Sequence, residues 1–367
     1  MTLLGIIGGG QLGRMLALAA APLGVRCRVL EPGAAPPATV AAVAAEIVHA
    51  DYDDPDGLAR LAEGIEVVTF EFENVPAEAV VWLSQRCQAC PGALALATAQ
   101  DRVEEKKLFR AQGIPIPAMR AVSDLGDLKS AVAAIGLPAV LKTRRLGYDG
   151  KGQAVLRGLE DLGPAWRAIG AAPAIVEAHV PFARELSIIA VRGRDGETGF
   201  YPLVENHHRD GILRLSIAPA PNLTIALQQQ AEAIARRVLD ALGYVGVLAI
   251  ELFQVGDTLM ANEMAPRVHN SGHWTIEGAT TSQFENHIRA VLGWPLGTTD
   301  VPRPAAMLNV IGTLPLVADV LAVPGAHLHL YDKAPRAGRK LGHVTVVADT
   351  PEALLDRVRS LQTLIET

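Results

Sequence analysis

Short apolar runs recur along the first quarter of the chain, and the stretches between them carry apolar residues at helical spacing. Three such runs are LLGIIGG at 3–9, VRCRVLEPG at 25–33 and EVVTFEFENVP at 66–76. Apolar runs of this length that alternate with helices are typical of parallel strands joined by helical crossovers. The pattern therefore predicts a doubly wound α/β domain, which we place at residues 1–98.

The pattern changes after a charged helix predicted at residues 100–115, whose end is signalled by Gly113 and Pro115. From residue 139 to 265, β-like runs follow one another closely and are separated by turns that contain glycine. Such spacing is typical of antiparallel sheet. One amphipathic helix, predicted at residues 227–242, interrupts these runs.

The domain boundaries follow from these changes in pattern. The mixed region at residues 99–295 is predicted to form a central α+β domain. Residues 296–367 contain short apolar runs and end in a helical pattern at 351–365, so they are predicted to form a small C-terminal domain. The expected fold class is therefore α/β and α+β, in three parts.

Composition narrows the class of protein. The 367 residues carry a net charge of −6 and 50% of them are hydrophobic, which indicates a globular protein with a substantial core. No Lys/Arg-rich run and no long apolar stretch is present, so we expect neither a nucleic-acid partner nor a membrane span. An odd count of 3 cysteines suits a reducing compartment. A cytoplasmic location is therefore predicted, and Cys87 and Cys90 are interpreted as structural.

A glycine-rich segment near the N-terminus raises the question of a nucleotide cofactor. Gly8, Gly10 and Gly13 form the pattern G-x-G-x-x-G between a predicted strand and a predicted helix, and Glu31 ends the next strand. This is the arrangement of a dinucleotide-binding loop. An NAD-dependent dehydrogenase is therefore one hypothesis, although the same tight turn serves other ligands at the carboxyl edge of a sheet.

A second glycine-rich segment, LKTRRLGYDGKGQAVL at 141–156, joins two predicted strands. A P-loop would lead into a helix, so this segment is of another kind. Glycines let the backbone approach a ligand closely, and Lys142 and Lys151 offer positive charge for phosphates. Taken alone, the segment fits an ordinary hairpin turn with a basic flank equally well. Its glycines are Gly147, Gly150 and Gly152.

Two glutamates are predicted to face each other across a hairpin. Glu251 and Glu263 lie at equal distances from Asp257, which falls in the turn between two predicted strands. Like charges in that position destabilise a hairpin, and a cation between them removes the penalty. Carboxylates commonly hold Mg²⁺ against substrate phosphates. The alternative is a pair of solvated glutamates on an exposed face.

The segment RVHNSGH, which begins at Arg267, is rich in hydrogen-bond donors. His269 and His273 stand four residues apart, which would allow a metal pair on a helix. The Asn-Ser-Gly between them disfavours a helix, so a zinc site is the weaker hypothesis. His207 and His208 either contact a ligand or belong to a polar loop.

Taken together, these segments resemble one family over nearly the whole chain. The family is N5-carboxyaminoimidazole ribonucleotide synthetase, an ATP-grasp carboxylase of purine biosynthesis. GYDGKGQ and NEMAPRVHNSGHWT set it apart from biotin carboxylases and from the formate-dependent purine transformylase. The matching segments are GGGQLGRM, TFEFENVP, QDR, LKTRRLGYDGKGQ, VEAHVPFARELS, ANEMAPRVHNSGHWT and YDKAPRAGRKLGHVT.

The resemblance implies an ATP-grasp fold with ATP between two antiparallel sheets, beneath the loop at 147–153. It implies that the segment at 177–180 meets the adenine edge and that Glu251 and Glu263 hold two Mg²⁺ ions. The residues it assigns to ATP, including those that neutralise phosphate charge and those near the ribose, are Arg102, Lys142, Gly147, Tyr148, Asp149, Gly150, Lys151, Gly152, Gln153, Glu177, Ala178, His179, Val180, Glu185, His208, Asn262 and Glu263.

The implied reaction is carboxylation of the exocyclic amine of aminoimidazole ribonucleotide by bicarbonate. Attack of bicarbonate on the γ-phosphate of ATP would form carboxyphosphate, and a closed loop would keep water away from it. Arg267, His269 and Asn270 would bind bicarbonate, because a guanidinium matches a planar anion. Tyr148 and Asp149 would orient or deprotonate the amine.

The ribonucleotide is expected near the C-terminal segment. The resemblance implies that Lys333 and Arg339 bind its 5′-phosphate and that Glu73 reaches the ribose hydroxyls. The first glycine loop would then line this site through Gln11 instead of binding NAD, and Glu31 would have no role. A homodimer is also implied. Less certain phosphate neighbours are Arg336 and Lys340.

Three alternatives remain open from the sequence. The first is an ATP-grasp ligase with another acceptor, such as the formate-dependent transformylase, and the segment at 331–343 argues against it. The second is the dehydrogenase, which would leave the pair Glu251 and Glu263 unexplained. The third is an inactive binding protein, although every charged position that the chemistry requires is filled.

Overall fold

The first part of the chain folds into a parallel sheet. Its first strand lies in the middle, and later strands are added on either side of it. The computed structural model describes residues 2–33, 38–147 and 150–365. The N-terminal elements are β1 (Leu3–Ile7), α1 (Gln11–Ala20), η1 (Ala21–Leu23), β2 (Arg26–Glu31), α2 (Ala38–Ala41), β3 (Glu46–His49), α3 (Pro55–Ala62), β4 (Val67–Phe70), α4 (Ala77–Ser84), β5 (Gln88–Ala89) and α5 (Ala93–Gln100). The strand order is β3-β2-β1-β4-β5, with parallel pairings throughout, as predicted.

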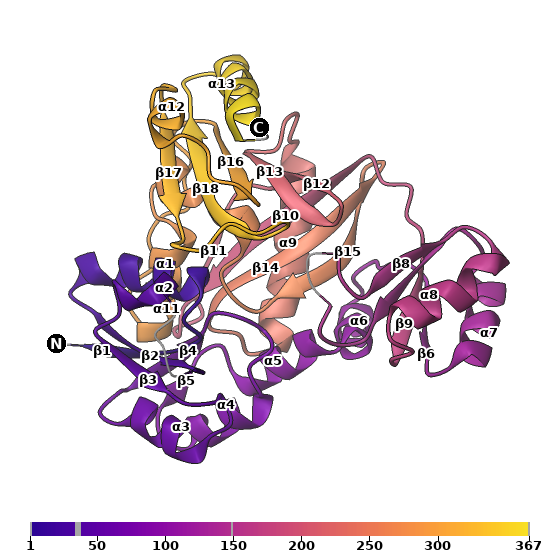
Figure 1. Ribbon diagram of the computed structural model, residues 1–367, viewed down its shortest axis with the longest axis horizontal. Helices are drawn as coiled ribbons and strands as arrows, with labels where there is room; N and C mark the ends of the chain where they lie inside the picture. The colour runs from indigo at the N-terminus through magenta and orange to yellow at the C-terminus, as the bar shows by residue number, and fades with distance from the viewer. Residues whose placement is uncertain (1, 34–37, 148–149, 366–367) are drawn as a thin grey trace.

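Both faces of this sheet are buried, which explains why its strands read as continuous apolar runs. Leu4 and Ile6 of β1 pack on the α1 side, whereas Ile7 belongs to the core formed with α3 and α4. In Figure 1, α1 and α2 accordingly lie on one side of the sheet and α3 and α4 on the other.

A small antiparallel sheet follows, and α6 connects it to the N-terminal part. Asp101 caps α6 by accepting a hydrogen bond from the amide of Val103, at 3.0 Å. The sheet has the strand order β6-β9-β7-β8. The elements of this part are α6 (Arg102–Ala111), β6 (Met119–Val122), α7 (Leu125–Ile135), β7 (Ala139–Thr143), β8 (Gln153–Leu156), η2 (Leu159–Asp161), α8 (Leu162–Ala168) and β9 (Ala174–Ala178).

The second antiparallel sheet is much larger and occupies the centre of the molecule (Figure 1). Its central-domain elements are β10 (Arg184–Arg192), β11 (Thr198–Phe200), β12 (Val204–Arg209), β13 (Ile212–Ala218), α9 (Ile225–Ala241), β14 (Gly246–Val255), β15 (Thr258–Ala265), η3 (Asn270–Gly272), α10 (Thr275–Gly278) and α11 (Gln283–Leu292). Helix α9 packs its apolar stripe against this sheet and buries Ile234 and Val238 among strand residues.

The last part of the chain adds strands to the same large sheet. Its elements are β16 (Ala305–Ile311), α12 (Val317–Leu321), β17 (Ala326–Leu330), β18 (Lys340–Val347) and α13 (Pro351–Ile365). Strand β16 pairs with β13, so the order of the sheet becomes β15-β14-β10-β12-β13-β16-β18-β17, and β11 pairs with β10. The domain limits at 98 and 295 stay a prediction, because a shared sheet does not mark where one domain ends.

The N-terminal sheet is tied to the centre of the molecule through α11. The imidazole of His287 bonds the hydroxyl of Thr69 at 2.8 Å through Nε2 and accepts from the amide of Val247 at 3.1 Å through Nδ1. This contact places the carboxyl edge of the N-terminal sheet beside the large sheet. Among the described helices, none has the length and apolar character needed to cross a membrane.

Candidate active site

The two glutamates of the β14–β15 hairpin face each other, as the sequence predicts. Glu251 pairs with Glu263 in the antiparallel register. The turn closes between Val255 and Thr258, and an unbroken ladder from there would place Glu251 opposite Asn262. A bulge makes Asn262 an extra residue on its strand, and this shift restores the facing glutamates.

The facing carboxylates Glu251 and Glu263 repel each other, and a cation between them would remove this repulsion. Burial and repulsion from Glu263 raise the pKa of Glu251. Burial acts in the same direction at Glu263, but Arg102 and Lys142 outweigh it and lower the pKa of that carboxyl. The guanidinium Nη1 of Arg102 lies 2.6 Å from Glu263 Oε2. The Glu251 side chain has only 18% of its surface exposed, so solvent screens its charge poorly.

The donor set fits a hard divalent cation. Two carboxylates and the amide of Asn262, whose Nδ2 lies 3.5 Å from Glu251 Oε2, gather at one place. Oxygen donors of this kind suit Mg²⁺, which usually completes its shell with water and substrate phosphates. Within the described part of the chain, no group of three or more His, Cys, Asp or Glu side chains is arranged to hold a metal.

Two lysines from α6 and β7 meet at a buried glutamate on β9. Lys106 Nζ lies 2.9 Å from one oxygen of Glu177, and Lys142 Nζ lies 2.7 Å from the other. Lys106 also donates to the carbonyl of Asn262, and Lys142 to its side-chain oxygen at 3.2 Å. Although burial would raise the pKa of Glu177, the two lysines lower it to about 2. The carboxylate therefore holds both cations beside the Glu251–Glu263 pair.

Lys106 is a residue that our sequence reasoning missed. Its side chain is only 1% exposed, which is rare for a lysine. The signal available was its position four residues after Arg102 on a predicted helix, because residues at that spacing share a face. Arg102 and Lys106 indeed both point toward β15.

The predicted adenine and ribose residues come from the end of β9 and from β10 and β12. Although burial would lower the pKa of His208, its bond to Glu185 and the charges of Glu251 and Glu263 raise it. Glu185 Oε2 lies 2.5 Å from His208 Nδ1, across the β10–β12 pairing. At the end of β9, the amides of Ala178 and His179 donate to backbone carbonyls at 2.8 Å and 3.2 Å. Val180 follows directly, and β10, which carries Glu185, begins at Arg184.

The second glycine-rich loop joins β7 and β8 of the small sheet and approaches the large sheet at Gly150. Gly150 has φ +76°, and a Cβ added there would lie 3.0 Å from the Cα of Gly211 in the β12–β13 turn. Gly152 accepts a hydrogen bond from the amide of Thr143 at 2.8 Å, and Gln153 begins β8. The loop therefore contacts the large sheet through Gly150, and close approach to Gly211 and to Thr143 requires glycine at 150 and 152.

Other predicted residues of this loop have a less complete description. Gly147 lies beside Arg102, since an added Cβ would approach Arg102 Nη2 to 3.4 Å. Lys151 lies in the loop between Gly150 and Gly152. Tyr148 and Asp149, predicted to act on the amine, lie outside the described residues.

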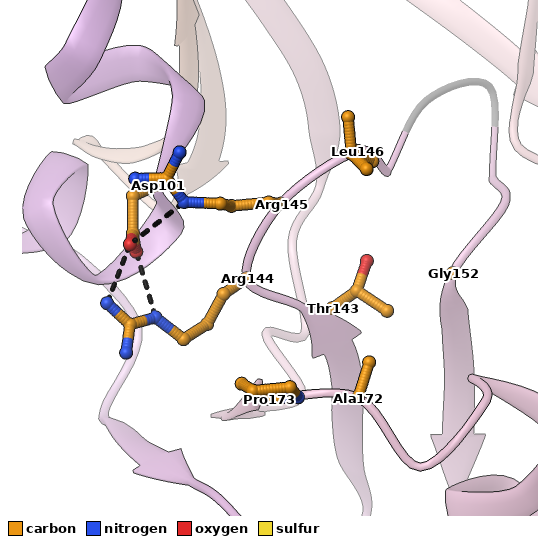
Figure 2. A pocket seen from close by; sticks show the side chains of 8 residues that line it. All are labelled: Asp101, Thr143, Arg144, Arg145, Leu146, Gly152, Ala172 and Pro173. Carbon is orange, nitrogen blue, oxygen red and sulfur yellow. Dashed lines mark hydrogen bonds and ion pairs between the residues drawn. The ribbon is translucent and has the colours of Figure 1, made fainter. Parts of the chain in front are cut away.

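A salt-bridge cluster holds the base of the loop (Figure 2). Arg144 donates to both oxygens of Asp101, from Nε at 3.0 Å and from Nη2 at 2.6 Å. Arg145 Nε lies 3.5 Å from Oδ2 of the same aspartate. These residues line a cavity of about 640 Å³ together with Thr143 and Leu146. Because Asp101 also caps α6, the loop and the helix that carries Arg102 share one anchor.

The predicted bicarbonate residues lie together after β15. Arg267 Nε donates to Glu73 Oε2 at 2.5 Å, and Arg267 Nη1 donates to the carbonyl of Val268 at 3.0 Å. Burial, together with the charge of Arg267, lowers the pKa of His269 to about 3. The Nδ2 of Asn270 is buried and has no hydrogen-bond partner among the described residues. An unpaired buried donor of this kind is costly unless a ligand accepts from it.

Helix α11 fixes the backbone of this segment. Gln283 accepts from the amide of His269 at 3.0 Å and donates to its carbonyl at 2.6 Å. A Cβ at Gly272 would lie 2.6 Å from the Gln283 side chain, so the glycine is needed for this contact. His273 packs against His343, with ring centroids 4.9 Å apart, and its Nδ1 lies 3.4 Å from Gln283 Nε2, so both contacts of the ring are inside the protein.

The C-terminal segment reaches the N-terminal loop. Lys333 Nζ donates to the side-chain oxygen of Gln11, although the two residues are 322 positions apart. Arg339 donates to the carbonyl of Ala334 at 3.3 Å, and Lys340 begins β18. The structure therefore brings Lys333 and Gln11 together, as predicted, whereas Arg336 lies on an exposed turn.

The first glycine-rich loop is filled by carboxylates of the chain itself. The amide of Gly13 donates to Glu71 Oε2 at 2.7 Å, and the amide of Gly10 donates to Glu71 Oε1. The amide of Gly9 donates to Glu31 Oε2 at 2.6 Å. A Cβ at Gly10 would lie 2.6 Å from the Glu71 carboxylate.

The helix N-terminus that would bind a pyrophosphate is thus occupied. Our expectation that Glu31 has no role was wrong, because its carboxylate accepts from the loop and from the hydroxyl of Tyr52 at 2.7 Å. Glu71, which sequence reasoning missed, ends the buried run that contains β4. The dehydrogenase hypothesis required these amides to bind the pyrophosphate of NAD, but they donate to Glu31 and Glu71 instead.

These elements define the class: two antiparallel sheets that enclose a cleft with facing carboxylates are those of an ATP-grasp protein. Family models match the chain as a ribonucleotide synthetase preATP-grasp domain at residues 1–100, an ATP-grasp domain at 107–284 and a phosphoribosylaminoimidazole carboxylase C-terminal domain at 305–357. The predicted fold class is thereby confirmed.

Relatives make the family specific. The chain is 54% identical to the N5-carboxyaminoimidazole ribonucleotide synthase of Pseudomonas aeruginosa, over 99% of each chain. It is 49% identical to the synthase of Brucella melitensis, over 93% of this chain and 95% of the relative. The chain belongs to the N5-carboxyaminoimidazole ribonucleotide synthase family.

Solved structures agree with this assignment. The structure of the synthetase from Thermus thermophilus superimposes with a TM-score of 0.94 at 53% identity and covers 99% of each chain. The synthase from Aspergillus clavatus, in complex with ADP and 5-aminoimidazole ribonucleotide, gives a TM-score of 0.91 at 33% identity and covers 100% of this chain and 98% of that one. The resemblance inferred from the sequence is therefore confirmed.

Proposed function

We propose that the protein is an ATP-dependent carbon–nitrogen ligase that carboxylates 5-aminoimidazole ribonucleotide with bicarbonate, releasing ADP and phosphate. The observation that carries this proposal is the facing pair of carboxylates, Glu251 and Glu263, beside the lysine cluster at Glu177. Two further features support it. Arg267 and the unpaired amide of Asn270 follow β15, and Lys333 contacts Gln11. Two relatives, 54% and 49% identical to this chain, are both named N5-carboxyaminoimidazole ribonucleotide synthase.

ATP would lie between the small and large sheets. Arg102, Lys142 and Lys151 would neutralise its phosphates, the 177–180 segment would meet the adenine, and Glu185 with His208 would lie at the ribose. Because phosphoryl transfer depends mostly on positioning and charge, a rigid lysine pair is what the step requires. Glu177 supplies that rigidity by holding Lys106 and Lys142.

Glu251 and Glu263, assisted by Asn262, would hold magnesium, and we propose two ions. Bound there, Mg²⁺ neutralises charge on the phosphate oxygens during phosphoryl transfer. The protein's own contribution is to keep both carboxylates in register through the bulge. Arg102, which now pairs with Glu263, would then be able to turn toward a phosphate oxygen.

Bicarbonate would bind between Arg267, His269 and Asn270. Its oxygen attacks the γ-phosphorus, the bond to the bridging oxygen of ADP breaks, and carboxyphosphate forms. Loss of phosphate releases CO₂, and the exocyclic amine attacks its carbon and loses a proton. The guanidinium and the unpaired amide of Asn270 orient the oxyanion and stabilise its charge. We assign Tyr148 and Asp149 to the amine.

The ribonucleotide would lie between the N-terminal loop and the C-terminal segment. We propose Lys333 and Arg339 for its 5′-phosphate, with Gln11 lining the site. Glu73 would reach the ribose through Oε1, because Oε2 is bonded to Arg267. Further phosphate contacts are proposed for Arg336 and Lys340. We also propose a homodimer, which sedimentation at several protein concentrations tests.

The test is phosphate release from ATP with magnesium and bicarbonate, measured with and without the ribonucleotide. We expect strong stimulation by the ribonucleotide and its loss when bicarbonate is removed. ATP turnover that ignores the ribonucleotide would retain the ATP-grasp assignment but require another acceptor.

A further inference from the structure

A row of buried polar side chains crosses three strands of the large sheet and ends at His269. Ser216, Asn206 and Ser187 lie on neighbouring strands, and Ser271 lies in η3. None of these four side chains belongs to a residue more than 5% exposed. Burying polar groups among Ile, Leu and Val costs free energy unless each is hydrogen-bonded.

The four residues form an unbroken chain of hydrogen bonds. Ser216 Oγ lies 2.8 Å from Asn206 Oδ1, and Asn206 Nδ2 lies 2.9 Å from Ser187 Oγ. Ser187 Oγ lies 2.8 Å from Ser271 Oγ, which lies 2.8 Å from His269 Nδ1. The chain therefore runs from strand β13 to the imidazole.

One backbone group sets the direction of every bond in this chain. The amide of Ser271 donates to His269 Nδ1 at 3.3 Å, and an amide N–H can only donate. Nδ1 must therefore carry a lone pair, so the Ser271 hydroxyl at the same nitrogen also donates. Its oxygen accepts from Ser187, whose oxygen in turn accepts from the amide of Asn206. Turning the His269 ring over would place a carbon against both donors.

We propose that this chain locks His269 in the neutral form with its proton on Nε2, so that the imidazole presents a fixed N–H donor to the bicarbonate oxyanion. The inference rests on the proposed function only in naming bicarbonate. Nε2 lies 3.6 Å from Glu251 Oε1, so the donor faces the carboxylate end of the cleft. An imidazolium would put a proton on Nδ1, against both donors.

His269 is therefore a hydrogen-bond donor in the reaction and not its general base, since its one lone pair is used inside the protein. Ser271, Ser187 and Asn206 are positioning residues, which act on the reaction only through the imidazole. The same arrangement is common at metal sites, where the partner of one ring nitrogen decides what the other presents.

The tautomer can be measured directly on the resting protein by ¹⁵N NMR of histidine-labelled enzyme, with the His269 signal identified by its absence in His269→Asn. We expect an unprotonated Nδ1 and a protonated Nε2. A proton on Nδ1, or a charged ring, would overturn the proposal. This readout needs no substrate, so it separates the lock from the proposed function.

Asn206→Asp reverses the chain with almost no change in shape, because a carboxylate can only accept from Ser187. The expected result is a shift of His269 toward the Nδ1–H form and a loss on the order of 10- to 100-fold in kcat/KM for bicarbonate, with the KM for ATP nearly unchanged. The matched control is Ser216→Ala, which removes a bond from the far end and leaves the donor direction unchanged.

Ser216→Ala should keep the wild-type tautomer and most of the bicarbonate kcat/KM. Equal losses in Asn206→Asp and Ser216→Ala would show a merely structural role for the row and overturn the lock. An altered tautomer without a change in bicarbonate kcat/KM would overturn the assignment of Nε2–H to the oxyanion.

Discussion

The two glycine-rich loops of this chain deal with anions in different ways. At residues 8–13, amide groups point at Glu71 and Glu31, which belong to the chain. In the second loop, Gly147 instead lies beside Arg102, and Gly150 approaches the backbone of Gly211 on the large sheet. Both loops use glycine for close approach, to a carboxylate of the chain in the first and to backbone and Thr143 in the second.

The difference shows that an anion-binding loop is defined by what fills it. A helix N-terminus favours any carboxylate, and a glutamate of the same chain reaches it without the entropic cost of association. The lysines of the second site also pair with a carboxylate of the chain, Glu177, which fixes the positions of Lys106 and Lys142. The amides of Gly10 and Gly13 are therefore used in a structural contact, whereas at the second site we propose that the prearranged charge binds phosphate.

The largest expected effect comes from breaking the facing pair in the second site. Glu263→Gln should reduce ATP-dependent phosphate release on the order of 1000-fold, because one metal-binding carboxylate is lost while Arg102 stays beside the other charges. Circular dichroism should show an intact fold. The matched control is Glu285→Gln, which breaks a surface pair with Arg289. Normal turnover in Glu263→Gln would remove the metal assignment.

The next effect concerns the carboxylate that holds the lysines. The pKa of Glu177 falls from 4.5 to about 2 in the folded state, so its stabilisation is complete above about pH 4.5 and is lost as the pH falls toward 2. Glu177→Gln should lower the free energy of unfolding by up to about 3 kcal/mol at pH 6.

Urea unfolding at several pH values tests this prediction. The difference between wild type and Glu177→Gln should narrow between pH 4.5 and 2. Glu160→Gln, at an exposed position, is the control and should follow the wild-type curve. Wild-type and Glu177→Gln curves that run parallel over this range would mean that Glu177 does not carry the charge we assign to it.

Removing the carboxylate that fills the first loop tests the other half of the comparison. Glu71→Ala removes the acceptor of the amides of Gly10 and Gly13 and should cost about 2 kcal/mol of unfolding free energy. The vacated N-terminus should then bind an added anion, so phosphate should raise the Tm of the variant more than that of the wild type. Glu71→Gln keeps one acceptor oxygen, so phosphate should raise its Tm by an amount between those for the wild type and Glu71→Ala. An equal response of all three proteins to phosphate would contradict an internal anion site.

The smallest effect sharpens the boundary of the ribonucleotide site. Arg339→Ala should raise the KM for the ribonucleotide about tenfold and leave the KM for ATP nearly unchanged, as the loss of one charged contact predicts. Arg303→Ala removes a positive charge elsewhere in the C-terminal part, beside Asp349, and serves as the control. Similar changes in both KM values for Arg339→Ala would exclude this residue from the phosphate site.

Much of the fold was predictable because apolar periodicity reports which face of each element is buried. The predicted terminal helix at 351–365 coincides with α13, and the runs at 3–9, 25–33 and 66–76 contain β1, β2 and β4. The short strand β3 was missed, since its residues Glu46–His49 carry no clear alternation. Its place at the sheet edge allows such a mixed composition.

The candidate site was predicted less completely, because its geometry depends on contacts between distant segments. Symmetry about Asp257 gave the right pairing of Glu251 and Glu263 for the wrong reason, since only the bulge at Asn262 produces it. A bulge depends on what the extra residue contacts, and here those contacts are Lys106 and Lys142 from another sheet.

The sequence by itself determined the family and most of the strands and helices, and it predicted which residue types would meet ATP. Only the tertiary structure decided that Glu71 fills the first glycine loop, that Lys106 reaches the cleft, and that one amide sets the tautomer of His269. The reason is physical. Periodicity is a local property of the chain, whereas hydrogen-bond direction and charge pairing depend on which distant groups the fold brings within about 3 Å.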